Sequence, residues 1–155
     1  MPAQLHTWIP RSEIERPIWT TLCTEQDFWK NFFADLKTCI RSIIVISPFL
    51  ANEATWRIIN EFKVLKQRGV QITIFTRPAN EHTNVNSFNL AINRLKTIGA
   101  EIKIVSKLHQ KIAIIDHRIW WEGSLNILSF RSSREHMRRF EGQDAVTILQ
   151  DIGLA

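Results

Sequence analysis

The segment KLHQKIAIIDHRIWWEGSLN, residues 107–126, combines chemically reactive side chains with two short apolar runs. It contains the pattern His-x-Lys-x4-Asp, formed by His109, Lys111 and Asp116. After six further residues comes Gly-Ser-x-Asn, which places together Gly123, Ser124 and Asn126. Each of these residues alone has an ordinary structural explanation, such as a turn aspartate or a lysine that reaches water. Their joint occurrence at short spacing indicates a chemical site.

The two apolar runs in this segment, QKIAIID and RIWWEG, predict two strands joined by a tight turn around residues 117 and 118. Because residues two apart share one face of a strand, we expect His109 and Lys111 to project side by side. On the second strand, Ser124 and Asn126 are expected to line the same end of the sheet.

Phosphoryl transfer needs a nucleophile together with cationic or amide donors around the phosphate oxygens. The histidine, the lysine and the asparagine of this segment supply both. Gly123 is expected to leave room for the close approach of a substrate. The segment therefore predicts a site that binds and attacks a phosphate ester.

The chain before this segment alternates helical and extended patterns. Helical spacing of apolar residues predicts helices over residues 24–40, 52–69 and from 87 to 99. The second carries Trp56, Ile59, Phe62 and Leu65 on one side. Thr24 with Asp27, and separately Asn52, are expected to cap two of these helices. The strands are expected at residues 43–46, 70–75 and 101–105, and a closing strand at 144–149.

This alternation predicts an α/β fold with a mixed, mostly parallel β-sheet covered by helices on both faces. The length of 155 residues suits one domain, which we expect to span residues 19–155. Residues 1–18 show little periodicity and are expected to form an irregular arm.

Composition points to a cytoplasmic protein with an acidic partner. The formal net charge of +5 favours nucleic acid, though composition alone supports this weakly. No apolar run approaches the roughly 20 residues of a membrane span, and the first residues lack the pattern of a signal peptide. We expect no membrane association. Cys23 and Cys39 are expected to be ordinary buried or half-buried thiols.

The motif resembles the HKD signature of the phospholipase D-like superfamily at every defining position, and the helix–strand alternation resembles that fold over roughly residues 24–150. The resemblance implies that His109 is the nucleophile or the acid. It implies that Lys111 and Asn126 hold the phosphate. Ser124 would then assist, and Asp116 would order the site more than react.

Members of this superfamily also place a glutamate downstream of the motif to orient the histidine. Glu135 in RSSREHMRR is the best match, and Glu141 is its rival. Four arginines follow the motif, and their guanidinium groups suit phosphate oxygens, although an ordinary solvated helix face is an equally good explanation. They are Arg131, Arg134, Arg138 and Arg139. Trp120 and Trp121 could stack on a base, but as neighbours on a strand at least one should be in the core.

Full-length phospholipases of the superfamily carry two HKD motifs, whereas this chain has one. The other histidines, none followed by a lysine two residues later, are His6, His82, His117 and His136. Since the family chemistry uses two histidines, the resemblance implies a homodimer with one shared site. The region offers no clustered acidic set for two metals and no zinc pattern, so no metal and no cofactor is expected.

These observations favour a metal-independent phosphodiesterase, namely a DNA endonuclease that works through a phosphohistidine. One alternative is a lipid phosphodiesterase of the same superfamily, although no amphipathic docking segment is evident. Another is a catalytically weak DNA-binding or assembly module that serves a helicase-like partner. A pure binding module, however, has no need of the intact motif.

Overall fold

The central strand β2 (Ser42–Ile46) illustrates why this sequence forms a two-sided sheet. Its residues alternate between two apolar layers, with Ile43 and Val45 packed into one and Ile44 and Ile46 into the other. Such burial on both faces is typical of a central strand. The computed structural model describes residues 19–129 and 134–155, and the expected arm at residues 1–18 lies outside them.

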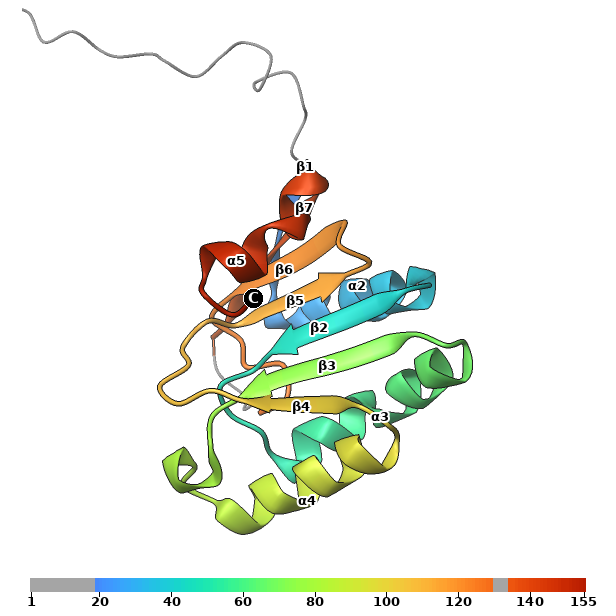
Figure 1. The fold of residues 1–155 in the computed structure, drawn as a ribbon. Coiled ribbons are helices and arrows are strands. Elements are labelled where there is room, and N and C mark those ends of the chain that lie inside the picture. Colours follow the sequence, from blue (N-terminus) through green and yellow to red (C-terminus); the bar gives the residue numbers. More distant parts are fainter. Residues whose placement is uncertain (1–18, 130–133) are drawn as a thin grey trace, which may run out of the picture.

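Seven strands form one sheet in the order β1-β7-β6-β5-β2-β3-β4 (Figure 1). The other strands are β1 (Trp19–Thr24), β3 (Gln71–Thr76), β4 (Glu101–Ile104), β5 (Ile112–Ile115), β6 (Ile119–Gly123) and β7 (His136–Glu141). The helices are α2 (Glu25–Thr38), α3 (Asn52–Gln67), α4 (Val85–Thr97) and α5 (Ile148–Asp151), with short 3-10 turns η1 (Ala79–Glu81) and η2 (Gln143–Val146).

The sheet is mixed, as expected, but the prediction that it is mostly parallel is wrong. Only the pairs β2–β3 and β3–β4 are parallel. The pairs β1–β7, β7–β6, β6–β5 and β5–β2 are antiparallel. The physical reason is that the described residues between β5, β6 and β7 contain no crossover helix, and short connections join antiparallel strands.

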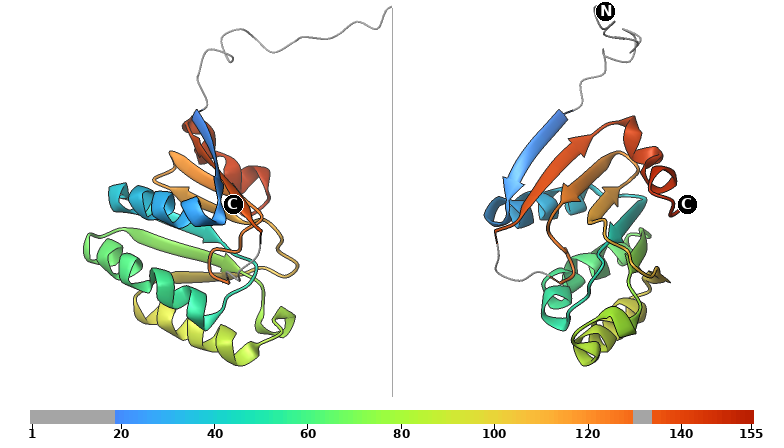
Figure 2. Two further views of the ribbon diagram at one scale, coloured as in Figure 1. Left: turned by 180° about the vertical axis from the view of Figure 1, so that it is seen from behind. Right: turned by 90° about the vertical axis from the view of Figure 1, so that its left-hand side faces the viewer.

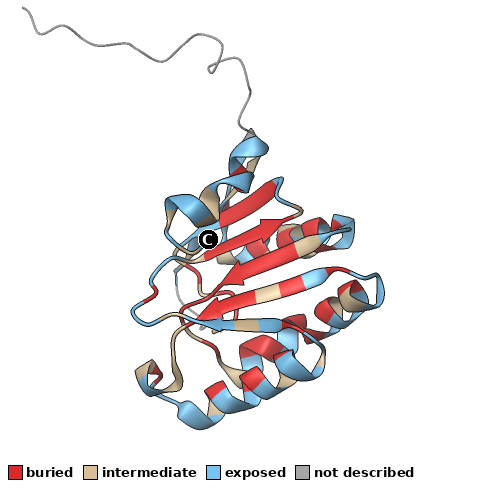
Figure 3. Cartoon of the chain, in the orientation of Figure 1, coloured by how far each residue is buried: buried red, intermediate tan, exposed pale blue. Residues whose placement is uncertain are grey.

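Helical segments lie on both faces of the sheet, in unequal amounts (Figures 1 and 2). The helices α2, α3 and α4 cover one face and enclose the larger core, which includes Phe28, Phe62 and Leu95. On the other face, the C-terminal segment with η2 and α5 packs against β5 and β6 through residues such as Ala145 and Ile148. In Figure 3 the buried residues lie mainly on the central strands and on the helix surfaces that face the sheet.

Three details of the predicted elements are corrected by the structure. Thr24 occupies the N-cap of α2 but its side chain makes no capping hydrogen bond. Asn52 is the first helical residue of α3 rather than its cap, and its amide oxygen accepts from Arg94 instead. Trp56 is 50% exposed and lies beneath the Arg94 guanidinium, 3.7 Å from the ring centroid. It is therefore outside the core.

The C-terminal region differs most from expectation. Residues 144–149 were expected to form a closing strand, but they belong to η2 and α5. The outer strands on that side are instead β1 and β7, which the sequence pattern did not predict. Six pairs of residues align the two strands, from Trp19 with Glu141 to Thr24 with His136. Polar side chains on both strands conceal their alternation.

Most strands of the sheet begin or end at the same edge. The carboxyl ends of β2, β3, β4 and β6 and the starts of β5 and β7 all lie at this edge, as the strand directions require. We call it the site edge. The opposite edge carries the β5–β6 turn, where Asp116 and His117 both have φ of 52°. Positive φ at two successive residues is the geometry of a type I′ hairpin turn.

Candidate active site

His109 lies in the loop Val105–Lys111, which connects β4 to β5 at the site edge. The strand begins only at Ile112, so His109 and Lys111 precede it, contrary to the expectation that both project from a strand. Leu108 anchors the loop because its side chain is buried in the smaller apolar layer. His109 itself is exposed. Its imidazole is thus presented at the surface by a loop that is tied to the core.

Lys111 is half-buried and its ammonium group donates to the carbonyl oxygen of His109 at 2.9 Å. Burial lowers the pKa of Lys111, and the nearby positive charge of Arg77 lowers it further, whereas the negative charge of Glu135 acts to raise it. Arg77 and Glu135 therefore both lie close enough to Lys111 for their charges to act on it. The structure therefore brings Lys111 and the predicted glutamate into one region.

Gly123 joins the two halves of the motif and also packs closely against β7. Its amide donates to the Lys111 carbonyl at 3.3 Å, which links the end of β6 to the residue directly before β5. A Cβ at this position would lie 2.2 Å from the carbonyl oxygen of His136. The glycine is thus required by the neighbouring strand β7. Ser124 continues this contact, since its amide donates to the His136 carbonyl and its hydroxyl accepts from the His136 amide.

Asn126 follows two residues later and carries an unusual polar atom. Its Oδ1 is buried and has no hydrogen-bond partner among the described residues. Such a group costs free energy unless something binds it, and the amide can equally present its NH₂ by rotating half a turn. Asn126 and Glu135 line the same hollow of about 530 Å³, next to Glu53 and His82. An amide that can donate into this hollow suits an anionic oxygen.

Asp116 lies away from these residues, at the opposite edge of the sheet. Four strand residues separate it from Lys111, and strand geometry makes that separation roughly 16 Å. Its carboxylate accepts backbone amide hydrogen bonds from Ile40, Arg41 and Ser42 at 2.8–3.0 Å. Burial acts to raise its pKa, but these amides outweigh that effect and the pKa is lowered. Asp116 therefore orders the α2–β2 connection, and the expectation that it orders the site is wrong.

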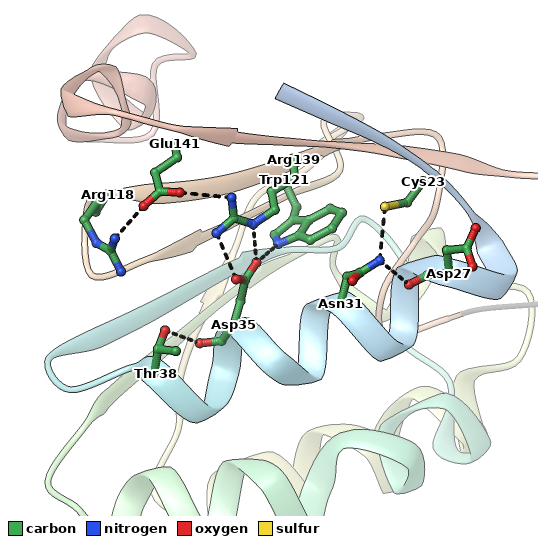
Figure 4. A network of polar contacts seen from close by, with 9 residues as sticks. All are labelled: Cys23, Asp27, Asn31, Asp35, Thr38, Arg118, Trp121, Arg139 and Glu141. Atoms are coloured by element: carbon green, nitrogen blue, oxygen red, sulfur yellow. Dashed lines mark hydrogen bonds and ion pairs between the residues drawn. The ribbon is translucent and has the colours of Figure 1, made fainter. Parts of the chain in front are cut away.

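Of the glutamates and arginines after the motif, Arg139 and Glu141 belong to a network of ion pairs and hydrogen bonds that includes Asp35 (Figure 4). Arg139 donates to both carboxylate oxygens of Asp35 and to Glu141, which also pairs with Arg118. Burial alone would lower the pKa of Arg139, but hydrogen bonding to Asp35, the largest effect, raises it. This network lies on the α2 side of the sheet. Glu141 and Arg139 thus stabilise the fold, and Glu135 is the glutamate at the site edge.

The remaining arginines have different surroundings. Arg138 is exposed on the other face of β7 and lines a groove of about 620 Å³ that also contacts Lys111 and Phe140. Arg134 is exposed just before β7. Arg131 lies outside the described residues. Of the predicted phosphate-contacting arginines, Arg138 therefore has the clearest connection to the site.

Both tryptophans of the motif are buried, so the hypothesis that one stacks on a base is wrong. Trp121 is fully buried, packs edge-to-face against Phe28 and donates to Asp35 at 2.8 Å. Trp120 lies on the other face, where its ring stacks on Phe140 at 4.8 Å. The sequence predicts at least one of the two tryptophans in the core, and the two-layered sheet buries both.

Two charged residues at the site edge escaped the sequence analysis. Arg77 directly follows β3, and Glu81 lies in the turn η1 after it. Both lie between the strand predicted at residues 70–75 and the helix predicted from residue 87. Their one available signal was position, since residues after the carboxyl end of a parallel strand face the same edge as the motif. His82 accepts from the Leu50 amide through Nε2, and burial lowers its pKa. It is therefore a neutral structural histidine.

Among the residues that the structure describes, no group of three or more His, Cys, Asp or Glu side chains lies together in a way that could hold a metal ion. Within the same residues, no helix has the length and apolar character to cross a membrane. The arrangement at the site edge offers instead an imidazole, an ammonium group and an amide. These groups can bind and attack a tetrahedral anion.

Comparison with known families identifies the class of protein. The family model described as "Cardiolipin synthase, PLD-like domain" matches residues 32–152. This chain therefore belongs to the phospholipase D-like family. No curated protein sequence matches it.

Solved structures share the fold at low sequence identity. NucT from Helicobacter pylori is 17% identical, with a TM-score of 0.70 over 88% of this chain and 93% of that one. The phospholipase D family member Nuc from Salmonella typhimurium is also 17% identical, with a TM-score of 0.71 over 87% and 91%. The archaeal chromatin protein TrmBL2 is 15% identical, with a TM-score of 0.54 over 89% of this chain and 51% of its own. At these identities the likeness shows the fold alone.

Proposed function

We propose that this protein is a metal-independent phosphodiesterase, specifically a DNA endonuclease with one active site shared between two copies. The observation that supports the proposal is the position of His109, Lys111 and Asn126 at the site edge. His109 is exposed there, its carbonyl accepts from Lys111, and the Lys111 carbonyl accepts from the amide of Gly123, three residues before Asn126.

The proposed chemistry has two steps. One His109 nitrogen attacks phosphorus, so that a P–N bond forms and the P–O bond to the leaving group breaks. The protonated His109 of the second copy gives its proton to the departing oxygen. Water then attacks the phosphohistidine, the now neutral second imidazole takes its proton, and the P–N bond breaks. Lys111 and Asn126 stabilise the charge on the phosphate oxygens in both steps.

The proposed chemistry needs two histidines, but the motif provides one, His109, which is exposed at the site edge. This favours a homodimer. His136 lies nearby on β7, but its backbone pairs with Ser124 and no lysine follows it at the required spacing. His82 is buried and accepts from a backbone amide. We propose that the second reactive imidazole comes from another copy, and the exposure of His109 permits two copies to meet there.

DNA is the proposed substrate because the chain is basic and because Arg138 extends positive charge from the site along β7. TrmBL2, which shares the fold, is described as a chromatin protein with a novel mode of DNA binding. We further propose that the protein acts in the cytoplasm, and that residues 19–155 form the catalytic domain.

Two alternatives follow from particular observations. The family description names cardiolipin synthase, which favours a lipid phosphodiester as substrate. The likeness to TrmBL2 favours a DNA-binding module, for instance one that assists a helicase-like partner. A lipid enzyme would cleave phospholipid vesicles in preference to DNA, and a binding module would retain DNA without cutting it.

The deciding experiment is a cleavage assay on labelled single- and double-stranded DNA with EDTA present, run beside His109→Ala. Cleavage should persist in the chelator, since the imidazole and ammonium groups perform the role of a metal, and it should vanish in the variant. Loss of cleavage in EDTA with recovery in magnesium would contradict the proposal.

A further inference from the structure

The loop that carries His109 is attached to the end of β3 at several successive residues. At its start, the amide of Val105 donates to the carbonyl of Thr76 at 2.8 Å. The next three residues, Ser106, Lys107 and Leu108, each bond to a charged side chain. The HKD motif alone does not account for these contacts, because all of them precede His109.

Glu81 makes two of the contacts. One carboxylate oxygen accepts a short hydrogen bond from the Ser106 hydroxyl, and the other accepts from the Lys107 amide at 3.0 Å. Lys107 has a φ of 60°, a left-handed conformation that a lysine adopts only at a cost. A charged acceptor at its amide stabilises that turn. The hydrogen bond from Ser106, the largest effect, and the bond from Lys107 lower the pKa of Glu81.

Arg77 makes the third contact. Its Nε donates to the carbonyl of Leu108 at 2.5 Å and lies 3.7 Å from a carboxylate oxygen of Glu81. The guanidinium also packs over the ring of Phe49, 4.9 Å from its centroid, and the Arg77 amide donates to Pro48. These contacts hold the side chain between the β2–α3 connection and the loop. Arg77 thus links the residue immediately before His109 to the rigid end of the sheet.

We propose that Arg77 and Glu81 form a clamp that positions His109 for attack on phosphorus. Together they immobilise residues 106–108, so the exposed imidazole projects from a fixed backbone. This inference rests on the proposed function, and it adds two positioning residues that do not touch the substrate. Precise placement of a nucleophile matters because a shift of about 1 Å can reduce turnover about 100-fold.

The expected result for Glu81→Ala is a decrease in kcat of about 10- to 100-fold with KM changed less than about threefold. The reason is that the phosphate-binding residues Lys111 and Asn126 remain in place. Ser106→Ala removes a single arm of the clamp and should reduce kcat severalfold. Because it leaves both charged residues intact, it also guards against misfolding in Glu81→Ala.

Arg77→Lys and Arg77→Gln separate geometry from charge. The lysine keeps the positive charge near Lys111 but lacks the Nε group that bonds to Leu108. A positioning role predicts that both variants lose turnover to a similar extent. Full activity in Arg77→Lys would show that only the charge matters and would overturn the role of Arg77 as a clamp.

A readout that needs no turnover keeps this test separate from the proposed function. In ¹H–¹³C NMR spectra the His109 imidazole signals can be assigned by their absence in His109→Gln. Glu81→Ala should broaden or shift them, while the signals of His117, at the opposite edge of the sheet, stay unchanged. If the wild type cleaves no phosphodiester, the proposed function fails, yet the spectra still test the clamp.

Arg118→Gln is the matched control. It also removes an ion pair from a carboxylate, Glu141, but at the opposite edge of the sheet. It should leave kcat, KM and the His109 signals as in the wild type. Unchanged kcat and unchanged His109 signals in Glu81→Ala would overturn the proposal.

Discussion

At the scale of single residues, Lys111 and Asn126 are the groups that we propose bind the phosphate. The ammonium group of Lys111 is half-buried, and the buried amide oxygen of Asn126 has no partner in the described residues. We expect Lys111→Ala and Asn126→Ala each to reduce kcat/KM about 100- to 1,000-fold, because each removes a donor to the developing charge. Steady-state cleavage kinetics on DNA measure the effect.

The matched control for the lysine is Lys103→Ala on β4, where the ammonium group lies over Phe75. It removes the same charge at an exposed position and should retain full turnover. Circular dichroism should show that all three variants fold. Wild-type rates in Lys111→Ala or Asn126→Ala would remove that residue from the site.

Asp116 is the contrasting case, because its carboxylate stabilises the α2–β2 connection and lies away from the site edge. Asp116→Ala should lower the free energy of unfolding by about 1–2 kcal/mol at pH 7, since three backbone amides lose a charged acceptor and the carboxylate is only partly buried. The turnover of the folded fraction should stay near that of the wild type. Urea unfolding combined with activity measurements checks both statements.

The pH dependence of this effect has a definite sign. The pKa of Asp116 is lower in the folded state, so its contribution to stability is complete above the unfolded pKa of about 3.9. The contribution disappears as the pH falls through the folded pKa. The stability difference between wild type and Asp116→Ala should therefore shrink on acidification below about pH 4. A large loss of kcat at unchanged stability would instead return Asp116 to the site.

At the scale of the element, the side chains of β7 alternate between two faces, and we propose that one face binds DNA while the other stabilises the fold. Arg138 faces the groove beside Lys111, whereas Arg139 faces α2 and pairs with the buried Asp35. We expect Arg138→Ala to weaken DNA binding and to reduce the slope of log K against log salt by about one, with little change in stability. Binding titrations at several salt concentrations measure this.

Arg139→Ala should behave in the reverse manner. It leaves Asp35 with the Trp121 indole as its remaining side-chain partner, so the free energy of unfolding should fall by about 2–3 kcal/mol. Its salt slope should match that of the wild type. Equal effects of the two substitutions on DNA binding would contradict the assignment of the two faces of β7.

At the scale of the whole molecule, the shared site predicts how mixtures of subunits behave. If one His109 attacks and the other donates a proton, a dimer of one wild-type and one His109→Ala subunit contains no complete site. After exchange at several ratios, activity should fall roughly as the square of the wild-type fraction. A linear dependence, with exchange demonstrated, would exclude the shared site, as would a fully active monomer.

The sequence by itself determined the family, the main helices and the residues of the motif. These features depend on local patterns. The apolar spacing of Phe28, Phe32 and Leu36 specifies a helix wherever it packs, and the HKD residues are recognised from their spacing alone. The burial of β2 on both faces also follows directly from its unbroken apolar run.

Only the tertiary structure decided which of those residues lie close together at one edge of the sheet. Asp116 belongs to the motif in sequence, yet β5 separates it from Lys111, because a strand carries its two ends to opposite edges of the sheet. Arg77 and Glu81 lie about 30 residues before His109 and meet its loop because the carboxyl ends of β3 and β4 share one edge. Strand β7 was hidden because its polar side chains conceal the alternation and its outer partner β1 is remote in sequence. Contacts of this kind depend on strand order, which no local pattern of residues encodes.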